Sequence, residues 1–234
     1  MRSIRIGGWL KSSFIDFPGL VATVLFFPGC NLCCGFCHNP HLVNGTSGFR
    51  VTEEEFRSFL KKRKGIIDGV VLSGGEPTVH CEDALLVSSL ARKEGCRVKL
   101  DTNGMEPGVI ERLSPDYCAL DVKTRPADYG TKLGASYPDA ADRLVRSIAI
   151  ARKMGPSAEI RVTAVPGLIN REIAREIGKL CRGIYRIFIQ PMHRNSPLLD
   201  PYYEKVKPIP PAEIEEFRTI LARYVTECVV RGAQ

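Results

Sequence analysis

Runs of residues typical of β-strands alternate regularly with runs typical of helices along most of this chain. The first such run, residues 20–27 (LVATVLFF), is apolar throughout, as expected for a strand that is buried on both faces. The six expected strands cover residues 20–27, 66–72, 97–100, 117–122, 159–165 and 185–190. Strands that are separated by helices predict parallel pairing with right-handed crossovers. Because six units are too few for an eight-stranded barrel, we expect an open, partial (β/α)6 TIM-like sheet or a doubly wound sheet.

The clearest helix start is at Thr52, an N-cap residue that precedes Glu53, Glu54 and Glu55. This helix should end near Lys62, where the basic run 61–64 complements the helix dipole. The other expected helices cover residues 82–93, 108–113, 139–153, 171–181 and 212–229.

The 234 residues suit one large domain. We expect a single domain over residues 1–234, with its core at about 18–193 and a C-terminal Pro-rich connector and helix over 194–234. The Pro-rich segment of this connector, Ser196 to Pro211, should be ordered.

No stretch approaches the roughly 20 apolar residues of a membrane-spanning helix, and the N-terminus has no long apolar region of a secretory signal. We therefore expect a soluble, cytoplasmic protein without membrane contact. The net charge of +7 is compatible with nucleic acid, an acidic protein partner or solubility alone. Because the densest basic run has no interleaved aromatic residues, we expect no nucleic-acid binding.

The nine cysteines favour metal binding over disulfides, because their number is odd and no export signal is evident. Four of them lie within residues 30–37. The other five are scattered singly, and we expect them to be buried or inert: Cys81, Cys96, Cys118, Cys181 and Cys228.

Within the cysteine loop, residues 29–40 (GCNLCCGFCHNP), Cys30, Cys34 and Cys37 have the spacing Cys-x3-Cys-x2-Cys, which differs from the paired Cys-x2-Cys units of zinc sites. Three thiolates can hold three irons of a [4Fe-4S] cluster and leave the fourth iron open to a substrate or cofactor. A structural zinc site with His38 or His41 as fourth ligand is the alternative. Cys33, which fits no complete pattern, is expected to be a spectator.

Further polar or glycine-rich segments lie at the ends of four of the other five expected strands. They are Ser73 to Pro77 (SGGEP), Asp101 to Gly104 (DTNG), Asp121 to Lys123 (DVK) and His193. Because the C-terminal ends of parallel strands meet at one rim of a sheet, we expect these segments and the cysteine loop to form one site.

The loop with Phe36 before its third cysteine resembles the signature of the radical S-adenosylmethionine (SAM) superfamily. The continuation 38–40 (HNP) and the upstream segment 13–19 (SFIDFPG) resemble the glycyl-radical-enzyme activating proteins, with the closest likeness to those of anaerobic ribonucleoside-triphosphate reductase. The likeness extends from Gly7 through His193.

This resemblance implies one [4Fe-4S] cluster per chain, held by Cys30, Cys34 and Cys37, with SAM bound at the open iron. It implies that one electron from a low-potential donor, such as flavodoxin or ferredoxin, cleaves SAM to methionine and a 5′-deoxyadenosyl radical. That radical would then generate a glycyl radical on a partner enzyme.

The resemblance also implies roles for the residues of the second segment. Gly74 and Gly75 would let the backbone approach the SAM amino group, with Glu76 nearby and Pro77 fixing the turn. An ordinary strand-to-helix turn is the alternative. Phe36 would lie beside the cofactor.

Asp101, Asn103, Asp121 and Lys123 resemble SAM-pocket residues, and His193 matches a histidine that contacts SAM in a relative. Lys123 could meet the SAM carboxylate as a point charge. In some relatives the two aspartates also help to bind a monovalent cation. An ion-paired strand end is the alternative for these four residues.

Arg161 would join the same pocket only if its side of the strand faces inward. Some glycyl-radical activators carry a cysteine-rich insert for additional clusters. Residues 39–51 contain no cysteine, so we expect a single cluster and a minimal activator.

Three other functions compete with this one. The chain could activate a glycyl radical enzyme of the pyruvate formate-lyase type. It could be a radical SAM enzyme that acts on a small molecule, although the segments 13–19 and 38–40 favour the activator. A non-catalytic iron–sulfur or zinc module is the third, and the polar segments at five strand ends argue against it.

Overall fold

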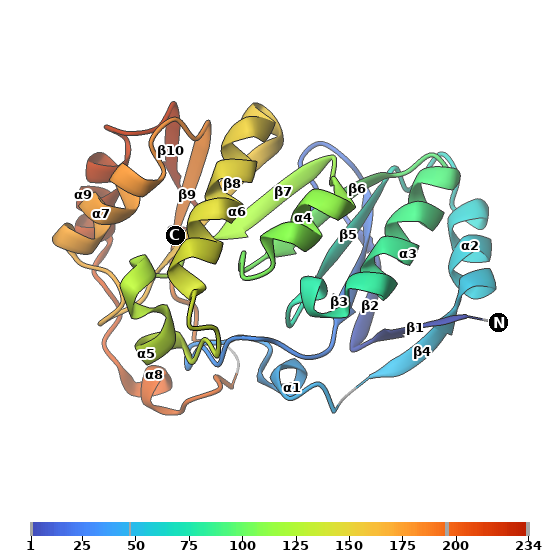
Figure 1. Cartoon of the computed structure of the whole chain (residues 1–234), viewed down its shortest axis with the longest axis horizontal. Coiled ribbons are helices and arrows are strands. Elements are labelled where there is room, and N and C mark those ends of the chain that lie inside the picture. Colours follow the sequence, from blue (N-terminus) through green and yellow to red (C-terminus); the bar gives the residue numbers. More distant parts are fainter. Residues whose placement is uncertain (1, 47, 195–196, 233–234) are drawn as a thin grey trace. The chain divides into compact units, whose positions relative to one another are not determined.

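The computed structural model describes residues 2–46, 48–194 and 197–232 (Figure 1). The chain divides into two compact units. The first unit comprises residues 1–30, 41–102 and 108–118, and the second comprises 31–40, 103–107 and 119–234. Strand β7 (Tyr117–Asp121) contributes its first two residues to the first unit and the rest to the second. The expectation of one domain stays a prediction.

The first unit contains a sheet with the strand order β6-β5-β3-β2. Strands β3, β5 and β6 pair in parallel, and β2 pairs antiparallel with β3. The strands are β2 (Gly8–Ser13), β3 (Ala22–Phe27), β5 (Gly69–Gly74) and β6 (Arg97–Thr102). A separate antiparallel pair is formed by β1 (Ser3–Ile6) and β4 (Phe49–Thr52).

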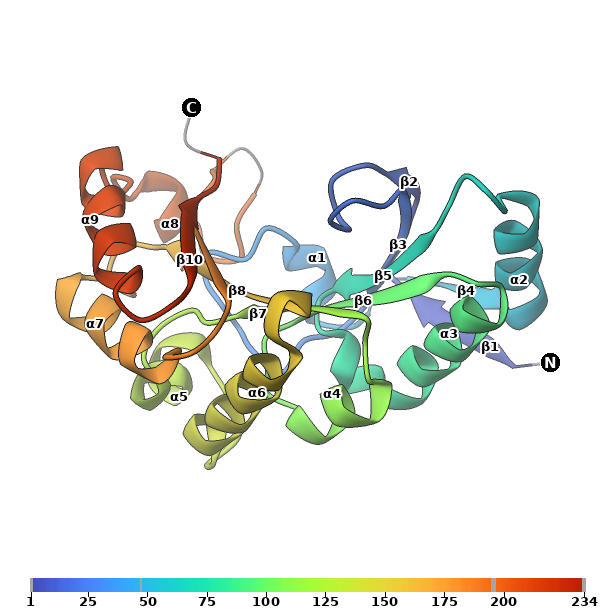
Figure 2. The same ribbon diagram turned by 90° about the horizontal axis from the view of Figure 1, so that it is seen from above.

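The helices of the first unit are α2 (Glu53–Lys62), α3 (Cys81–Lys93) and, apart from their first residues, α1 (Pro40–Val43) and α4 (Pro107–Leu113), with a 3-10 turn η1 (Pro77–His80). Helices α3 and α4 lie on the same side of β5 and β6 (Figure 2). Strand β3 is buried on both faces as predicted, and its side chains Ala22 and Val24 pack with Phe17, Val71 and Tyr117.

Helix α2 confirms the start predicted at Thr52 and the end predicted at Lys62. The Thr52 hydroxyl accepts from the Glu55 N–H at 3.1 Å, and Glu55 Oε2 accepts from the Thr52 N–H at 2.7 Å. This reciprocal pair satisfies two backbone donors that a helix N-terminus otherwise leaves unpaired.

The second unit contains the parallel strand order β10-β9-β8. Its elements are η2 (Pro126–Asp128), α5 (Tyr129–Leu133), α6 (Ala140–Met154), η3 (Gly155–Ser157), β8 (Ala158–Ala164), α7 (Arg171–Leu180), β9 (Arg186–Pro191), α8 (Tyr202–Lys205), α9 (Pro211–Leu221) and β10 (Glu227–Val230). Helices α7 and α9 contact each other, and α9 packs on β9 and β10.

The predicted α/β class with parallel strands is confirmed, but three details of the prediction are wrong. The structure adds β1, β2, β4 and β10 to the six expected strands. Strand β5 begins at Gly69 rather than 66, because the N–H groups of Ile66 and Ile67 bond back to the Arg63 carbonyl in the turn after α2.

The last helix was expected to run through residue 229 but ends at Leu221. The segment after it, which is rich in β-branched residues, instead forms β10 beside β9. Arg186 and Glu227, which are partners in this pairing, form an ion pair at 2.6 Å. The connector contains α8, and Ser196, at its start, lies outside the described residues.

Of the scattered cysteines, Cys96, Cys118 and Cys181 are buried, and Cys81 and Cys228 are half-buried. Within the described ranges, no helix is both long and apolar enough to cross a bilayer.

Candidate functional site

Cys34 and Cys37 lie one turn apart in the second unit, where the Cys37 N–H donates to the Cys34 carbonyl at 3.0 Å. Cys34 is buried, and this burial raises the pKa of its thiol to about 11, an effect that the nearby Lys123 ammonium opposes. Only a strong positive partner would keep such a thiol ionised. A coordinated metal ion supplies that charge, since a coordinating thiol is deprotonated outright.

The other two cysteines of the loop have different surroundings. Cys30 belongs to the first unit, where its N–H donates to the Val43 carbonyl at 3.1 Å. Cys33 is exposed in the second unit, and its N–H donates to the Leu133 carbonyl at 2.8 Å. None of the nine cysteines, all of which the structure describes, forms a disulfide.

The donor chemistry of these thiols fits an iron–sulfur cluster. In residues 2–46, 48–194 and 197–232, however, no three Cys, His, Asp or Glu side chains are grouped to hold a metal ion. Ligation by Cys30, Cys34 and Cys37 therefore stays a prediction.

Phe36 is buried in the second unit between a cation and a tyrosine. Its ring lies 5.8 Å from Lys123 Nζ and meets the Tyr203 ring edge-on at a centroid distance of 6.0 Å. The Asp200 N–H donates to the Gly35 carbonyl at 2.8 Å. The segment around α8 thus holds the middle of the cysteine loop.

The end of β7 carries a half-buried ionic triad. Asp121 accepts from Lys123 Nζ at 3.0 Å through one oxygen and from Arg161 Nε at 2.7 Å through the other. Burial disfavours the charged form of Asp121, but Arg161 and Lys123 outweigh it and lower its pKa to about 2. Arg161 therefore faces Asp121, which settles its orientation. The ion-paired strand end that was the alternative for these residues is present, and a role in SAM binding stays a prediction.

In the first unit, Gly74 and Gly75 leave no room for a side chain. A β-carbon on Gly74 would lie 2.3 Å from the Phe27 nitrogen, and one on Gly75 would lie 2.1 Å from the Gly29 oxygen. The Gly75 N–H donates to the Phe27 carbonyl at 2.8 Å. These glycines let the end of β5 lie against the backbone that leads to Cys30. The predicted approach of their backbone to the SAM amino group stays a prediction.

Glu76 has a structural role that the sequence did not reveal. Its buried Oε1 accepts from the Thr78 N–H at 3.1 Å, the Thr78 hydroxyl at 2.6 Å and the Thr102 hydroxyl at 2.8 Å. Glu76 thereby caps η1 and ties it to the end of β6.

Asp101 at the end of β6 forms an ion pair with the buried Lys99 and accepts from Ser73 Oγ at 3.1 Å. The hydrogen bond between Ser73 and Asp101 links the ends of β5 and β6, which carry the second and third predicted segments. The ion pair with Lys99 matches the alternative of an ion-paired strand end.

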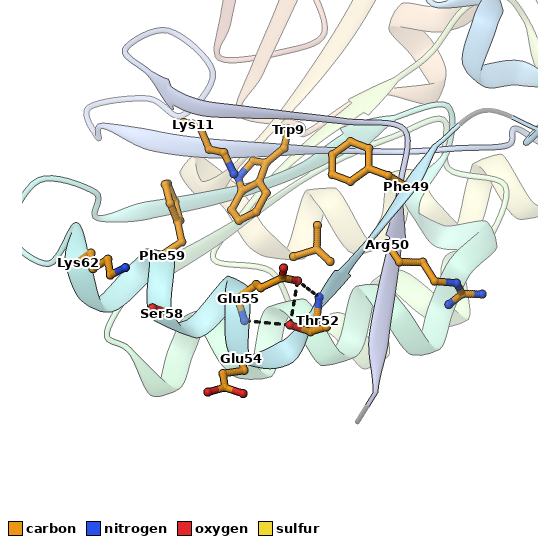
Figure 3. Close-up of a pocket in the computed structure, with 11 residues that line it drawn as sticks. Trp9, Lys11, Phe49, Arg50, Thr52, Glu54, Glu55, Ser58, Phe59 and Lys62 are labelled. Carbon is orange, nitrogen blue, oxygen red and sulfur yellow. Dashed lines mark hydrogen bonds between the residues drawn. The ribbon is translucent and has the colours of Figure 1, made fainter.

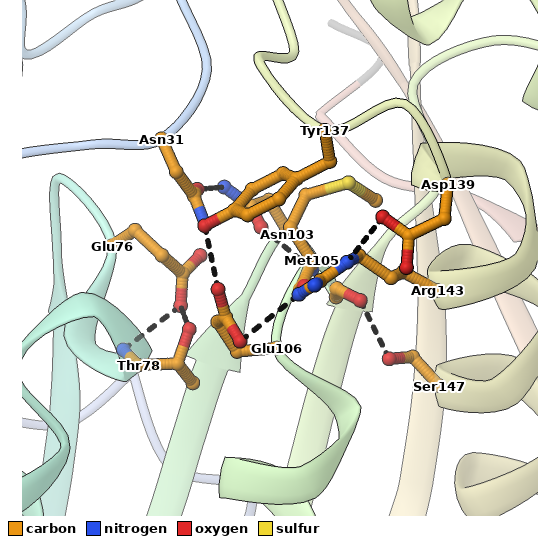
Figure 4. A network of polar contacts seen from close by, with 11 residues as sticks. Asn31, Glu76, Thr78, Asn103, Met105, Glu106, Tyr137, Asp139, Arg143 and Ser147 are labelled. Carbon is orange, nitrogen blue, oxygen red and sulfur yellow. Dashed lines mark hydrogen bonds and ion pairs between the residues drawn. The ribbon is translucent and has the colours of Figure 1, made fainter.

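Asn103, by contrast, belongs to the second unit and is buried within a polar network (Figure 4). Its Nδ2 donates to Asn31 Oδ1 at 2.7 Å, and Asn31 Nδ2 donates to the Tyr137 hydroxyl at 3.3 Å. Asn31, Tyr137 and Glu106, which accepts from the Tyr137 hydroxyl, were not predicted from the sequence. No pattern signalled them, because Asn31 and Tyr137 lie 106 residues apart.

His193 is exposed at the end of the segment after β9, with its ring centroid 6.2 Å from that of His38. Burial, followed by the charges of His193 and Lys123, lowers the pKa of His38. The structure thus places His193 beside the HNP continuation of the cysteine loop.

A surface pocket of about 720 Å³ in the first unit is lined by none of the predicted site residues (Figure 3). Trp9 and Phe59 line it with ring centroids 4.9 Å apart, and the Lys11 ammonium lies over the Trp9 ring. The Lys11 ammonium therefore already occupies one face of the Trp9 ring.

Comparisons with known proteins agree with this arrangement. The model of the radical SAM superfamily matches residues 24–180. Over 237 residues the chain is 30% identical to MJ1227 of Methanocaldococcus jannaschii, a provisionally named glycyl-radical enzyme activating enzyme, covering 97% of this chain and 95% of that protein. It is 29% identical over 190 residues to the pyruvate formate-lyase-activating enzyme of Clostridium pasteurianum, covering 78% of each.

Among solved structures, SuiB of Streptococcus suis bound to S-adenosylmethionine matches with a TM-score of 0.65 and 17% identity. The match covers 90% of this chain and 52% of SuiB, so the chain spans about half of that protein. This likeness shows the fold, and the predicted partial (β/α)6 architecture with a parallel sheet is confirmed.

Proposed function

The chain belongs to the radical SAM superfamily and, within it, to the glycyl-radical enzyme activating enzymes, and from this membership we propose that it generates a glycyl radical on anaerobic ribonucleoside-triphosphate reductase. The observation that carries the proposal is the cysteine loop, whose buried Cys34 and neighbouring Cys37 lie beside Phe36 and Lys123. The superfamily implies a [4Fe-4S] cluster and SAM.

Cys30, Cys34 and Cys37 would hold the cluster. The chemistry that cluster and SAM supply when bound is one-electron cleavage of the sulfonium carbon–sulfur bond, which yields methionine and a radical able to take a hydrogen atom from glycine. The chain's own residues bind and orient these groups and exclude water from them.

Lys123 is proposed to bind the SAM carboxylate. Its ammonium is held by Asp121, which raises its pKa and keeps it charged, although burial opposes this. Asp121 and Arg161 would fix its position rather than contact SAM directly. Asn103, His193 and the backbone at Gly74 and Gly75 are proposed as further SAM contacts.

Asp101 and Asp121 would contribute to a monovalent-cation site only after giving up part of their present pairing, because Lys99 and Lys123 already neutralise them. Sodium or potassium dependence of SAM cleavage would support that cation.

The proposed partner is a protein, and a low-potential flavodoxin or ferredoxin is the proposed electron donor. The segments 13–19 and 38–40 resemble those of glycyl-radical-enzyme activators, which supports a protein partner, and the likeness of the chain to activators of the anaerobic reductase supports that reductase. Matches to pyruvate formate-lyase-activating enzymes favour a second candidate, pyruvate formate-lyase.

The test is to reconstitute the cluster without oxygen, add reductant and SAM, and mix the protein with each candidate partner. We expect 5′-deoxyadenosine and a glycyl-radical signal in electron paramagnetic resonance (EPR) with the reductase. A signal with pyruvate formate-lyase alone would select the second candidate, and SAM cleavage with no protein radical on either would favour a small-molecule substrate.

Two cysteine variants test the ligand set. Cys34→Ala should lose the cluster's iron and sulfide, whereas Cys33→Ala, which changes an exposed neighbouring thiol, should retain them. Equal loss in both variants would contradict the assignment, and zinc in place of iron in wild-type protein would overturn the proposed function.

A further inference from the structure

The side-chain amide of Asn31, the residue directly after Cys30, is bonded at both ends (Figure 4). Its Oδ1 accepts from Asn103 Nδ2 at 2.7 Å, and its Nδ2 donates to the Tyr137 hydroxyl at 3.3 Å. All three residues belong to the second unit, but they come from the cysteine loop, the segment after β6 and the segment before α6. One amide therefore connects the start of the cysteine loop to Asn103.

The carboxylate of Glu106 sets the direction of these hydrogen bonds. The Tyr137 hydroxyl has one proton and donates it to Glu106 Oε1 at 2.5 Å, because a carboxylate only accepts. The Tyr137 oxygen is then the acceptor for Asn31 Nδ2, so Asn31 must turn its own oxygen toward Asn103. Asn103 in turn keeps its Oδ1 for the Met105 N–H, which donates to it at 3.0 Å.

Arg143 from α6 holds both ends of the Tyr137–Glu106 pair. Its Nη1 donates to Glu106 Oε2 at 3.1 Å and to the Met105 carbonyl at 3.0 Å, and its guanidinium carbon lies 4.1 Å from the Tyr137 ring centroid. Its Nε pairs with Asp139 at 2.9 Å. The charge-assisted bond from the guanidinium holds the Glu106 carboxylate in place beside the Tyr137 hydroxyl, so the direction of the whole chain of bonds is fixed.

We infer that Tyr137 and Glu106 are positioning residues for SAM binding. They fix the orientation of the Asn31 amide, and this amide holds the start of the cysteine loop at a fixed position relative to Asn103. The inference rests on the proposed function, which assigns the loop to the cluster and Asn103 to SAM. Without the Tyr137 hydroxyl, the Asn31 amide has lost the acceptor that selects its orientation, and the two parts of the pocket are no longer pre-organised.

The test compares wild-type and Tyr137→Phe holoprotein, reconstituted without oxygen. SAM affinity is measured by equilibrium dialysis and by the SAM-induced change in the EPR spectrum of the reduced cluster. We expect wild-type iron and sulfide content but SAM binding weakened about tenfold, as for loss of one well-placed hydrogen bond. Unchanged SAM affinity would overturn the inference.

Two further variants separate positioning from general destabilisation. Tyr185→Phe removes another hydroxyl of the second unit, just before β9, and should leave SAM affinity unchanged. Thr52→Ala lowers stability through the α2 cap in the first unit and should also leave it unchanged. Equal weakening in either control would assign the effect to stability and overturn the inference.

Glu106→Gln keeps the shape of the side chain but lets the Tyr137 hydroxyl either donate or accept, so the amide orientation is no longer selected. We expect weaker SAM binding here too, and this variant decides the question by the same measurement if Tyr137→Phe cannot be isolated with its cluster. Wild-type affinity in Glu106→Gln would then count against the inference.

A double-mutant cycle tests whether Tyr137 acts through Asn31. The Asn31→Ala/Tyr137→Phe protein should bind SAM no more weakly than Asn31→Ala alone, whereas additive losses would overturn the inference. Failure of the proposed function is distinguishable: if the cluster and SAM assignment is wrong, wild-type holoprotein itself would bind no SAM, and if only the partner is wrong, SAM binding in the wild type is unaffected.

Discussion

The ring of Tyr203 lies directly against the backbone of Gly35 in the middle of the cysteine loop, so close that a β-carbon on Gly35 would lie 2.5 Å from Cε2 of the ring. Gly35→Ala must therefore displace the ring of Tyr203, which also contacts Phe36. We expect this substitution to lower the free energy of unfolding by about 1–3 kcal/mol, the usual cost of overpacking. Denaturant unfolding of the variant and wild type measures it.

The control for this prediction removes the obstacle. In a Tyr203→Ala background the ring is gone and the nearest remaining atom to the added methyl group is Asp200 Cβ at 3.1 Å, so Gly35→Ala should cost much less there than in the wild type. The same cost in both backgrounds would show that the ring is not what excludes a side chain at this position.

Asp121 should make stability depend on pH in the acid range. Its pKa is lowered from 3.8 to about 2 in the folded protein, so the unfolded chain takes up the proton first as the pH falls. The stabilisation is fully present above about pH 4 and is lost between about pH 4 and pH 2, amounting to about 2 kcal/mol. Across this pH range, the free energy of unfolding should therefore fall by about 2 kcal/mol less in Asp121→Asn than in the wild type.

At neutral pH, Asp121→Asn should itself lower stability by about 3 kcal/mol, because it leaves Lys123 and Arg161 largely buried without their carboxylate. Glu111→Gln, on the exposed side of α4, removes a carboxylate with the same change in charge and should cost almost nothing. Equal effects in the two variants would assign the loss to net charge.

The N-cap of α2 supplies a prediction confined to the first unit (Figure 3). Thr52→Ala removes the hydroxyl that accepts from the Glu55 N–H and should lower the free energy of unfolding by about 1 kcal/mol. Thr52→Ser keeps the acceptor and should remain close to wild type in thermal unfolding. A serine variant as unstable as the alanine variant would mean that the methyl group of Thr52 matters more than its hydroxyl.

The sequence predicted those features whose cause is local. The Thr52 cap lies within four residues, and the apolar run that became β3 carries its own burial pattern. Strand β10 was missed because its four residues become a strand through pairing with β9, and a short amphipathic segment is compatible with helix or strand until its neighbour is known.

The candidate site follows the same division. The cysteine spacing and the glycines after β5 could be recognised as motifs, but the distant partners of Glu76 and Asn31 could not. Thr102 and Tyr137 lie 26 and 106 residues from them along the chain, and no periodic pattern connects such positions. Hydrogen bonds between distant segments become visible only when the fold brings the segments together.

Gly75 gives the sharpest steric prediction, because its obstacle is backbone. A β-carbon there would lie 2.1 Å from the Gly29 oxygen, and no rotamer change can relieve that contact. Gly75→Ala should therefore separate the end of β5 from the segment that leads to Cys30, at a cost of about 3 kcal/mol. Gly108→Ala is the matched control, because nothing lies within 4 Å of its β-carbon and α4 gains a better helix former, with an expected gain of about 0.5 kcal/mol. Chemical denaturation of both variants decides the matter, and a Gly75→Ala protein as stable as wild type would mean that the two backbone segments can separate without cost.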